Sequence, residues 1–397
     1  MNKCILVCLS VCLLAACSQA ENGITIGETL SIKSEILGED RPYAIYLPDS
    51  YNDEISSPKS YPVLYLLDGD AHFRSTTGVM QYMSTGNGGN TQIPEMIVVA
   101  IPNTDRMRDL SPTHSTVNLD GKEMPFFETS GGGDRFLQFI EEELQPEIES
   151  SYRTKPFNVL VGHSLGGLLA AHAMLESRKN FQAYIAIDPA LWWDEEVMIR
   201  RAKDQIQNAE RLSGQIYLSM ANTEVPSVDQ NLFKDPVTEF SALLKTAESP
   251  DFRSELQYFG AEDHSSVPIP SLYHGLLFVF DGYKPPPALF YGEPSRLNAH
   301  FEGVSDRLGI TLLPPEDLVN GMGYQMLYFE QDVDKAIGLL TLNTLNYPES
   351  FNVYDSLAEA YMVGEDKVLA ITNYEKSLEL NPDNQNAVEQ LEALRAE

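Results

Sequence analysis

One serine stands in a setting that suits a nucleophile. The stretch FNVLVGHSLGGLLAAHAM, which begins at Phe157, contains the pattern G-x-S-x-G with Ser164 at its centre. β-Branched and apolar residues before the pattern predict a buried strand, and the Leu- and Ala-rich residues after it predict a helix. A turn this tight needs glycines, and it lifts the serine hydroxyl out of the sheet. The stretch therefore predicts a nucleophile elbow, with a plain turn as the alternative.

A serine hydroxyl needs a base to remove its proton, and a neutral imidazole is the usual base near neutral pH. Enzymes with this elbow place the serine, the acid and the histidine in that order along the chain. His264 fits this order, because it follows the last expected strand in the stretch GAEDHSSV. His172, on the helix after the serine, is expected to be a packing or surface residue. His264 is therefore the predicted base.

Three carboxylates compete for the role of the acid that orients the histidine. The acid is expected after the strand that precedes the histidine's own strand, which leads to Glu224 and, slightly further on, to Asp229. Asp188 ends the strand directly after the elbow helix, one strand earlier than the commonest arrangement. The sequence thus ranks Glu224 first, Asp229 second and Asp188 third. For each of them the alternative is a solvated loop charge.

The elements that must position these residues alternate between strands and helices from Ile24 to about Tyr283. Such alternation is typical of an α/β fold, in which helices cover both faces of a mostly parallel sheet. Arg135–Ile148 is one of the expected helices. The expected strands are an antiparallel pair, Leu30–Leu37 and Tyr43–Leu47, followed by Pro62–Leu67, Met96–Ile101, Asn158–Val161, Ala183–Ile187, Gln215–Ser219 and Glu255–Phe259.

A run of prolines after Lys284 ends this alternation. It predicts a stiff linker over residues 284–298, between an enzyme domain at 24–283 and a small all-α domain at 299–397. In the helical part a set of packing residues recurs 34 positions later, which is the tetratricopeptide period. The recurring residues are Ala336, Leu340 and Pro348, matched by Ala370, Tyr374 and Pro382. A tetratricopeptide-like domain is expected, with a plain helical bundle as the alternative.

The first residues predict export. An apolar run, Cys4–Ala16, follows Lys3 and has the form of a signal-peptide core. It ends in Leu-Ala-Ala-Cys, which resembles the bacterial lipobox and implies cleavage before Cys17 with a lipid on its thiol. We therefore expect a signal peptide at 1–16, a lipidated tether at 17–23, and a lipoprotein held at the periplasmic face of a membrane or at the cell surface. An ordinary secretory signal is the alternative.

Composition narrows the function further. The chain has 58 acidic and 27 basic residues and a formal net charge of −31, which disfavours nucleic-acid binding. All four cysteines lie within the first 17 residues, so neither a disulfide nor a thiol catalyst is expected in the mature domain. The histidines lack metal-ligand spacing, and the glycines at 131–133 are not followed by the Lys of a phosphate loop. No metal or other cofactor is expected.

Five stretches carry a resemblance to the esterase D family of the α/β-hydrolase superfamily. They are YPVLYLLDGDAHF, DRMRDLSPT, GGGDRFLQFIEEELQPEIESSYRT, VGHSLGGL and GAEDHSSV. The resemblance covers roughly Ile24–Tyr283. The family includes S-formylglutathione hydrolases, feruloyl esterases, enterobactin-type siderophore esterases and secreted mycolyltransferases. The resemblance thus implies an α/β-hydrolase fold and acyl-ester chemistry.

The resemblance also implies roles for individual residues. An oxyanion needs two fixed backbone donors, of which one is the amide of Leu165, directly after the nucleophile. The family's second donor follows an Asp-Gly pair and maps onto the amide of Asp70. A Glu after the penultimate strand is a frequent acid in the family, which supports Glu224. The substrate is expected to contact three further side chains, Trp192, Trp193 and Arg106, for which core packing and a surface ion pair are the alternatives.

The expected function is that of an exported serine ester hydrolase that forms an acyl-enzyme intermediate. Siderophore, feruloyl or acetyl-sugar esters are the expected substrates. Two alternatives remain from the sequence. One is acyl transfer to an acceptor other than water. The other is a scaffold protein whose helical repeats bind a protein partner.

Overall fold

The computed structural model describes residues 23–85, 91–119, 121–176, 180–209, 211–222, 229 and 231–396. The expected signal peptide, the expected lipidation site at Cys17 and the candidate acid Glu224 lie outside the described residues. Among the described residues, no helix has the length and apolar character needed to cross a membrane.

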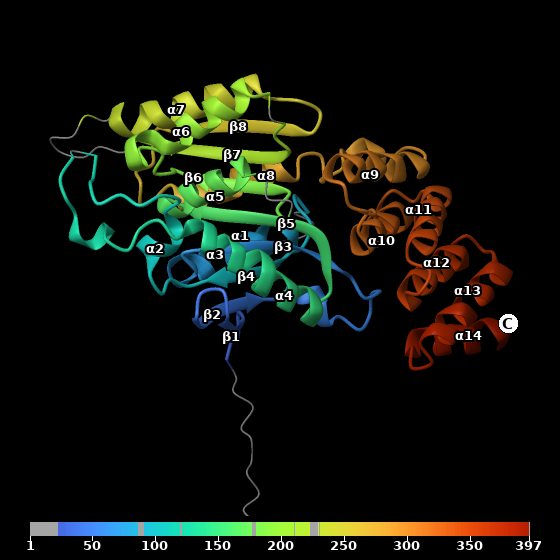
Figure 1. Cartoon of the computed structure of the whole chain (residues 1–397). Coiled ribbons are helices and arrows are strands. Elements are labelled where there is room, and N and C mark those ends of the chain that lie inside the picture. The colour runs from blue at the N-terminus through green and yellow to red at the C-terminus, as the bar shows by residue number, and fades with distance from the viewer. Residues whose placement is uncertain are drawn as a thin grey trace, which may run out of the picture.

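Eight strands in the described part of the chain form one sheet in the order β1-β2-β4-β3-β5-β6-β7-β8 (Figure 1). β1 pairs with β2, and β2 with β4, in antiparallel fashion, whereas all other neighbours are parallel. The expected α/β class and the antiparallel N-terminal pair are confirmed. The strands are β1 (Glu28–Ser34), β2 (Glu39–Tyr46), β3 (Tyr61–Leu67), β4 (Ile97–Ile101), β5 (Thr154–His163), β6 (Ala183–Ile187), β7 (Gly214–Ala221) and β8 (Phe252–Phe259).

Helices connect the strands and continue beyond the sheet. Within the first part of the chain they are α1 (Gly69–Ser84), α2 (Arg106–Leu110), α3 (Gly133–Phe139), α4 (Gln145–Ser151), α5 (Leu165–Leu175), α6 (Trp193–Gln207), α7 (Asn231–Thr246) and α8 (Pro268–Val279). The C-terminal helices are α9 (Ser295–Leu308), α10 (Glu316–Tyr324), α11 (Val333–Asn346), α12 (Phe351–Val363), α13 (Lys367–Leu380) and α14 (Gln385–Ala396). A π-helical turn, η3 (Ile140–Leu144), joins α3 to α4, so the helix expected at Arg135–Ile148 is present with an irregular middle.

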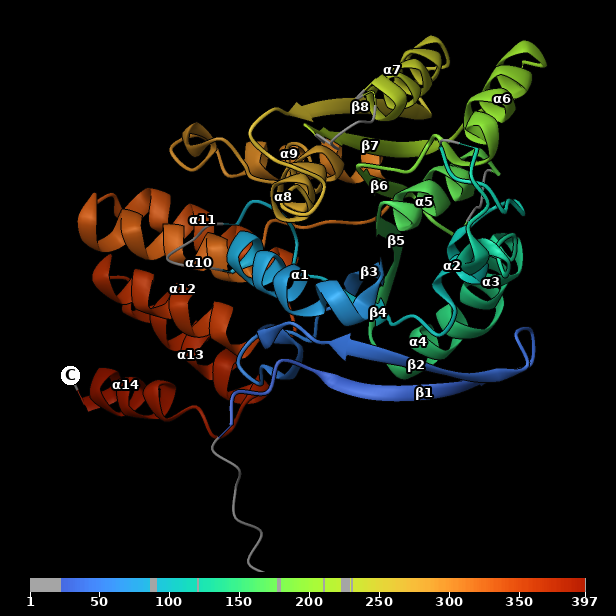
Figure 2. The same ribbon diagram turned by 90° about the vertical axis from the view of Figure 1, so that its left-hand side faces the viewer.

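The central strands are buried on both faces, as expected for a parallel sheet between two helical layers. On β3, Val63, Tyr65 and Leu67 pack in one apolar cluster together with α3 to α7. Leu64 and Leu66 point the other way, into a second cluster with α1 and α8. Figure 2 shows the same division, with α1 and α8 on one side of the sheet and α2 to α6 on the other.

The C-terminal helices share the second of these clusters. Phe301 and other apolar residues of α9 to α12 belong to one continuous core with β3 and β5. Phe301 packs edge-on against Tyr283, at 5.6 Å between ring centroids, and α9 begins at Ser295, inside the expected linker. The proline-rich segment therefore does not separate two apolar cores, contrary to expectation. Within the described C-terminal helices, a smaller cluster around α13 and α14 lies apart from the shared core.

The C-terminal helices meet the sheet where its parallel strands begin. Lys155, at the start of β5, donates to the carbonyl of Thr311 at 2.7 Å, and the backbone N–H of Ser57, before β3, donates to Glu316 at 3.3 Å. A cavity of about 270 Å³ lies at this junction. The opposite edge of the sheet, where the parallel strands end, is the one at which α/β enzymes place their sites. The tetratricopeptide assignment of these helices stays a prediction.

Candidate active site

Ser164 occupies a strained turn between β5 and α5. Its φ of 60° and ψ of −114° lie outside the regions that L-residues favour. A Cβ atom on Gly162 would come within 2.2 Å of the backbone of Gly166, so only glycine allows the strand and helix to approach this closely. The Ser164 N–H donates to the carbonyl of Ile187 at 3.0 Å, which ties the turn to the end of β6. This is the geometry expected of a nucleophile elbow.

His264 lies beside the elbow and is held by Asp188. Its Nδ1 is 2.6 Å from Asp188 Oδ2. The Asp188 side chain is 12% exposed, whereas the His264 side chain is 41% exposed and open to solvent. Asp188 is fixed in turn, because its Oδ1 accepts from the backbone N–H of Ala221 at 2.9 Å and its own N–H donates to the Ser219 carbonyl at 3.1 Å. A carboxylate in this position orients the imidazole and leaves Nε2 free for a reacting group.

Among the candidate acids that the structure describes, Asp188, which the sequence ranks third, is the one that contacts His264, whereas Glu224 lies outside the described residues. Asp229 accepts from the backbone N–H of Asn231 at the start of α7 instead. The reason lies in the loop after β8, which folds back over the end of β7: the Asn222 N–H donates to the Glu262 carbonyl at 2.8 Å. His264 thus passes over β7 and reaches the end of β6.

Two further histidine rings, those of His163 and His72, pack one after the other next to His264. The ring of His163, next to Ser164 in the chain, lies 4.4 Å from the His264 ring at a tilt of 38°. The ring of His72 packs edge-on against His163 at 5.7 Å. Burial, and next the neighbouring rings of His264 and His72, lower the pKa of His163 to about 4. His163 is thus neutral near neutral pH, and its buried Nε2 has no hydrogen-bond partner among the residues that the structure describes.

The two expected oxyanion donors lie at the starts of two helices. Leu165 is the first residue of α5, and Asp70 is the second residue of α1. The first N–H groups of a helix have no acceptor within it, so both amides are available to an external oxygen. Asp68 precedes α1 with a φ of 53°, in the left-handed region. Asp68, Ser164 and Asp188, whose φ is 40°, are thus all strained, which is common at functional sites.

Arg106 is engaged with the protein itself. Its Nε and Nη2 donate to the two oxygens of Asp68, at 2.7 and 2.9 Å. The alternative for Arg106, an ion pair, is therefore present, although the pair is partly buried rather than on the surface. A contact between Arg106 and the substrate stays a prediction. Asp68 is 5% exposed.

The two tryptophans differ. Trp193 is fully buried, its indole N–H donates to the carbonyl of Thr113 at 3.2 Å, and its ring packs against Phe127 at 5.0 Å. It is a core residue, so its expected contact with substrate is wrong. Trp192 is half-buried and packs on Trp193 at 5.9 Å between ring centroids. Its contact with substrate stays a prediction.

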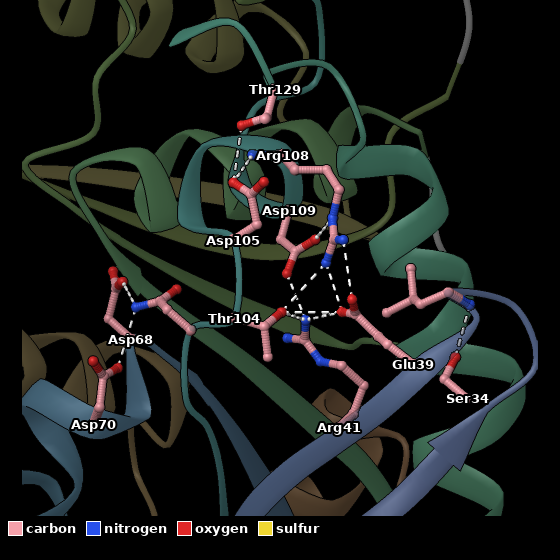
Figure 3. A network of polar contacts seen from close by, with 12 residues as sticks. Ser34, Glu39, Arg41, Asp68, Asp70, Thr104, Asp105, Arg108, Asp109 and Thr129 are labelled. Atoms are coloured by element: carbon pink, nitrogen blue, oxygen red, sulfur yellow. Dashed lines mark hydrogen bonds and ion pairs between the residues drawn. The ribbon is translucent and has the colours of Figure 1, made fainter. Parts of the chain in front are cut away.

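A buried ion network holds α2 beside the site (Figure 3). Asp109, at the end of α2, accepts from Arg41 at 2.7 Å and from Arg108 at 2.7 Å, and the side chains of Arg41 and Asp109 are almost wholly buried. Glu39 on β2 pairs with both arginines, and its hydrogen bond from Arg108 outweighs burial and lowers the pKa of Glu39 to about 2. This network was not predicted from the sequence, because its members are charged residues that lie far apart in the chain.

His172 is a packing residue, as expected. It is fully buried within α5, and its Nε2 lies 2.8 Å from Asp134. Within the described ranges, no group of His, Cys, Asp and Glu side chains is arranged to hold a metal ion.

Known proteins are similar to this chain over much of its length. Residues 34–266, more than half of the chain, match the family model described as Putative esterase. The "Ferri-bacillibactin esterase BesA" of Bacillus subtilis is 29% identical over 257 residues, which cover 62% of this chain and 87% of the relative. The "Siderophore enterobactin esterase" of Emericella nidulans is 29% identical over 258 residues, which cover 56% of this chain and 84% of the relative.

A solved structure is similar over more of the chain. It is that of an IroE-like serine hydrolase from Shewanella oneidensis, which is 32% identical and superposes with a TM-score of 0.72. The similarity covers 81% of this chain and 99% of that one, and so extends beyond the sheet into the C-terminal helices.

Proposed function

The chain belongs to the Putative esterase family and is a carboxylic-ester hydrolase, and we propose that it acts through a covalent acyl-enzyme on siderophore-type esters. The observation that carries the mechanism is the 2.6 Å contact between His264 and Asp188 beside the strained Ser164. The substrate class rests on the relatives, whose names describe esterases of bacillibactin and enterobactin.

In the first half of the reaction, Ser164 Oγ attacks the ester carbonyl carbon while His264 Nε2 takes the hydroxyl proton. The carbonyl oxygen becomes an oxyanion, which accepts from the N–H groups of Leu165 and Asp70. The tetrahedral intermediate then expels the alcohol, which receives the proton from His264. Asp188 holds the imidazole in one tautomer and stabilises its protonated form.

In the second half, water attacks the acyl-enzyme. His264 takes a proton from the water, the oxyanion forms again in the same place, and Ser164 leaves with the proton that His264 returns. Release of the carboxylic acid regenerates the free enzyme. Both halves use the same three side chains, so removing any one of them affects both steps.

Substitution of the three side chains tests this mechanism. Ser164→Ala and His264→Ala should each lower kcat for p-nitrophenyl butyrate by on the order of 10⁶, and the double variant should be scarcely worse. Asp188→Ala should cost on the order of 10⁴ or less, because an acid orients and stabilises without forming bonds.

Asp229→Ala is the matched control, and thermal melts show whether each variant is folded. Ordinary activity in a folded Ser164→Ala protein would refute the mechanism. Greater damage from Glu224→Ala or Asp229→Ala than from Asp188→Ala would refute the choice of acid. Turnover of p-nitrophenyl butyrate without cleavage of enterobactin or bacillibactin would refute the substrate class alone.

The location of the enzyme is a separate part of the proposal. The signal-like run at 1–16 and the lipobox-like end at Cys17 support export followed by lipidation. After expression in a bacterium, the wild-type protein should partition into the detergent phase, and Cys17→Ala should not, because only the thiol can accept the lipid. Equal partitioning of the two proteins would contradict the lipoprotein assignment.

A further inference from the structure

The carboxylate of Asp68 lies between the two turns that carry the oxyanion donors. Asp68 immediately precedes α1, the helix on which the Asp70 amide lies. On its other side, a Cβ atom built on Gly166 would be 3.3 Å from Asp68 Oδ2. Gly166 directly follows Leu165, which supplies the other donor. One carboxylate therefore lies beside both turns that carry the expected oxyanion donors.

Arg106 joins the same two turns. Its guanidinium binds both oxygens of Asp68 in a bidentate pair, and its Nη2 also donates to the carbonyl of His163 at 3.4 Å. His163 directly precedes the nucleophile. Asn103 links Asp68 to Asp70 in the first turn of α1, because its amide donates to Asp68 Oδ1 at 2.7 Å and to Asp70 Oδ1 at 3.1 Å. Figure 3 shows Asp68 and Asp70 next to each other at the start of α1.

The ion pair between Asp68 and Arg106 is stabilised by its electrostatics and by the fixed position of α2. Burial opposes ionisation of Asp68, but the hydrogen bonds and charge of Arg106 outweigh it, and the pKa of Asp68 is lowered from its ordinary value. The backbone of Arg106 is also fixed, since α2 is held at both ends. Asp105 caps the first turn by accepting from the Arg108 N–H at 3.0 Å, and Asp109 is bound by Arg41 and Arg108 at the other end.

We propose that Arg106, through Asp68, is a positioning residue that fixes the distance between the Asp70 and Leu165 amides. The two donors belong to different helices, α1 and α5, so nothing in either helix alone sets their separation. An oxyanion hole stabilises the transition state only when both donors reach the oxygen, and a shift of about 1 Å can cost on the order of 100-fold in rate. This inference rests on the proposed serine mechanism.

A positioning role and a substrate-binding role for Arg106 predict different kinetics. A guanidinium that bound substrate would contribute to KM and would favour anionic esters. A guanidinium that positions the oxyanion donors contributes to the transition state, lowers kcat when it is lost, and acts on uncharged esters as well.

The test uses the full-length protein and the uncharged ester p-nitrophenyl butyrate. Arg106→Gln should lower kcat about 100-fold and Arg106→Lys about 10-fold, with KM changed by less than about 3-fold. Asp68→Asn should behave like Arg106→Gln, and the double variant should be no worse than either, because both act through one ion pair. Affinity for an alkyl boronic acid, which forms a tetrahedral adduct with the serine, should fall in parallel with kcat/KM.

Arg307→Gln is the matched control, because Arg307 is similarly exposed, at 31% against 36% for Arg106, and pairs with Asp281 on the far side of the molecule. Its kinetics should equal those of the wild type. If the folded Arg106 variants raise KM and leave kcat unchanged, or bind the boronic acid normally, the proposal is wrong while the Ser164 mechanism stands. If Ser164→Ala retains activity, the mechanism itself is wrong.

Discussion

At Asp188 the backbone takes a φ of 40°, which non-glycine residues rarely adopt, and the carboxylate after this turn contacts both His264 and the Ala221 N–H at the end of β7. The motif around Ser164 could be read from the sequence because its residues are adjacent and glycine has a specific steric use there. The acid could not, because its identity depends on how the loop after β8 folds across β7. Asp188 was visible only as a carboxylate at a strand end, a feature that other candidates shared.

The same reasoning applies to Arg106. The sequence left a substrate contact or a surface ion pair open for Arg106, and only the contacts revealed its bidentate pair with the buried Asp68. For Trp193 the sequence likewise left a substrate contact or core packing open, and full burial with a 3.2 Å bond from its indole to the Thr113 carbonyl places it in the core.

Stability at mild acid pH should depend on His163. Its pKa of about 4 in the folded protein lies below the ordinary 6.5, so the unfolded chain binds more protons between these two pH values. The free energy of unfolding that this residue contributes is therefore complete above pH 6.5 and is lost as the pH falls towards 4, by on the order of 3 kcal/mol.

Urea unfolding of the wild type and of His163→Phe at pH 7 and pH 5 measures this term. The variant should lose less free energy of unfolding than the wild type on acidification. His300→Gln, which changes a histidine on α9, should follow the wild type. A wild-type and a His163→Phe protein with equal acid sensitivity would show that His163 does not titrate as the structure indicates.

At the scale of elements, the strand and helix pattern predicted the fold well because burial on both faces gives parallel strands their continuous apolar runs. The strands β3 to β7 appear where those runs predicted them, with ends that differ by a few residues. The π-helical turn η3 was not predictable, since the apolar spacing of Arg135–Ile148 agrees with a regular helix. Of these elements, the elbow between β5 and α5 depends most strongly on one residue type, glycine.

Gly162→Ala should greatly reduce the yield of soluble protein or the melting temperature. A methyl group there would lie 2.2 Å from the backbone of Gly166, which cannot move without breaking the start of α5. Gly303→Ala, in the middle of α9, is the matched control. Apart from its chain neighbours and the backbone of its own helix, no described atom lies within 4 Å of its added Cβ, so alanine should stabilise the helix by about 0.5–1 kcal/mol. A soluble Gly162→Ala protein with an unchanged melting temperature would contradict the packing described for the elbow.

At the scale of the whole molecule, the C-terminal helices lie against the edge of the sheet where the parallel strands begin, away from Ser164 and His264. The proline-rich segment suggested two independent units because prolines often separate domains. The sequence could not reveal that apolar residues on both sides of this segment pack against each other. The helices thus support the fold of the enzyme part, and a partner for them is a separate proposal.

Deleting the chain after Pro287 should abolish soluble protein, because it removes Leu297, Phe301 and other members of the core shared with β3 and β5. A shorter deletion after Leu380 removes only α14 and should leave soluble protein with normal esterase activity, because α14 packs in the small separate cluster. Expression yield and circular dichroism compare the two. A folded, active protein ending at Pro287 would show that the shared core is dispensable.

If the substrate is a siderophore ester, as we propose, net charge should decide which form of it is cleaved. The formal charge of −31 gives a field that repels anions, and Arg106 is neutralised by Asp68. The ferric complex of a catecholate siderophore is an anion, whereas its iron-free ester is uncharged. We therefore expect kcat/KM for the iron-free ester to exceed that for the ferric complex by about 10- to 100-fold at low ionic strength.

Added salt should narrow this gap through screening, mainly by raising kcat/KM for the ferric complex, whereas hydrolysis of p-nitrophenyl butyrate should not change. Equal kcat/KM values for the two forms at low salt, or a gap that salt does not alter, would show that contacts within the site rather than the charge of the whole molecule select the substrate.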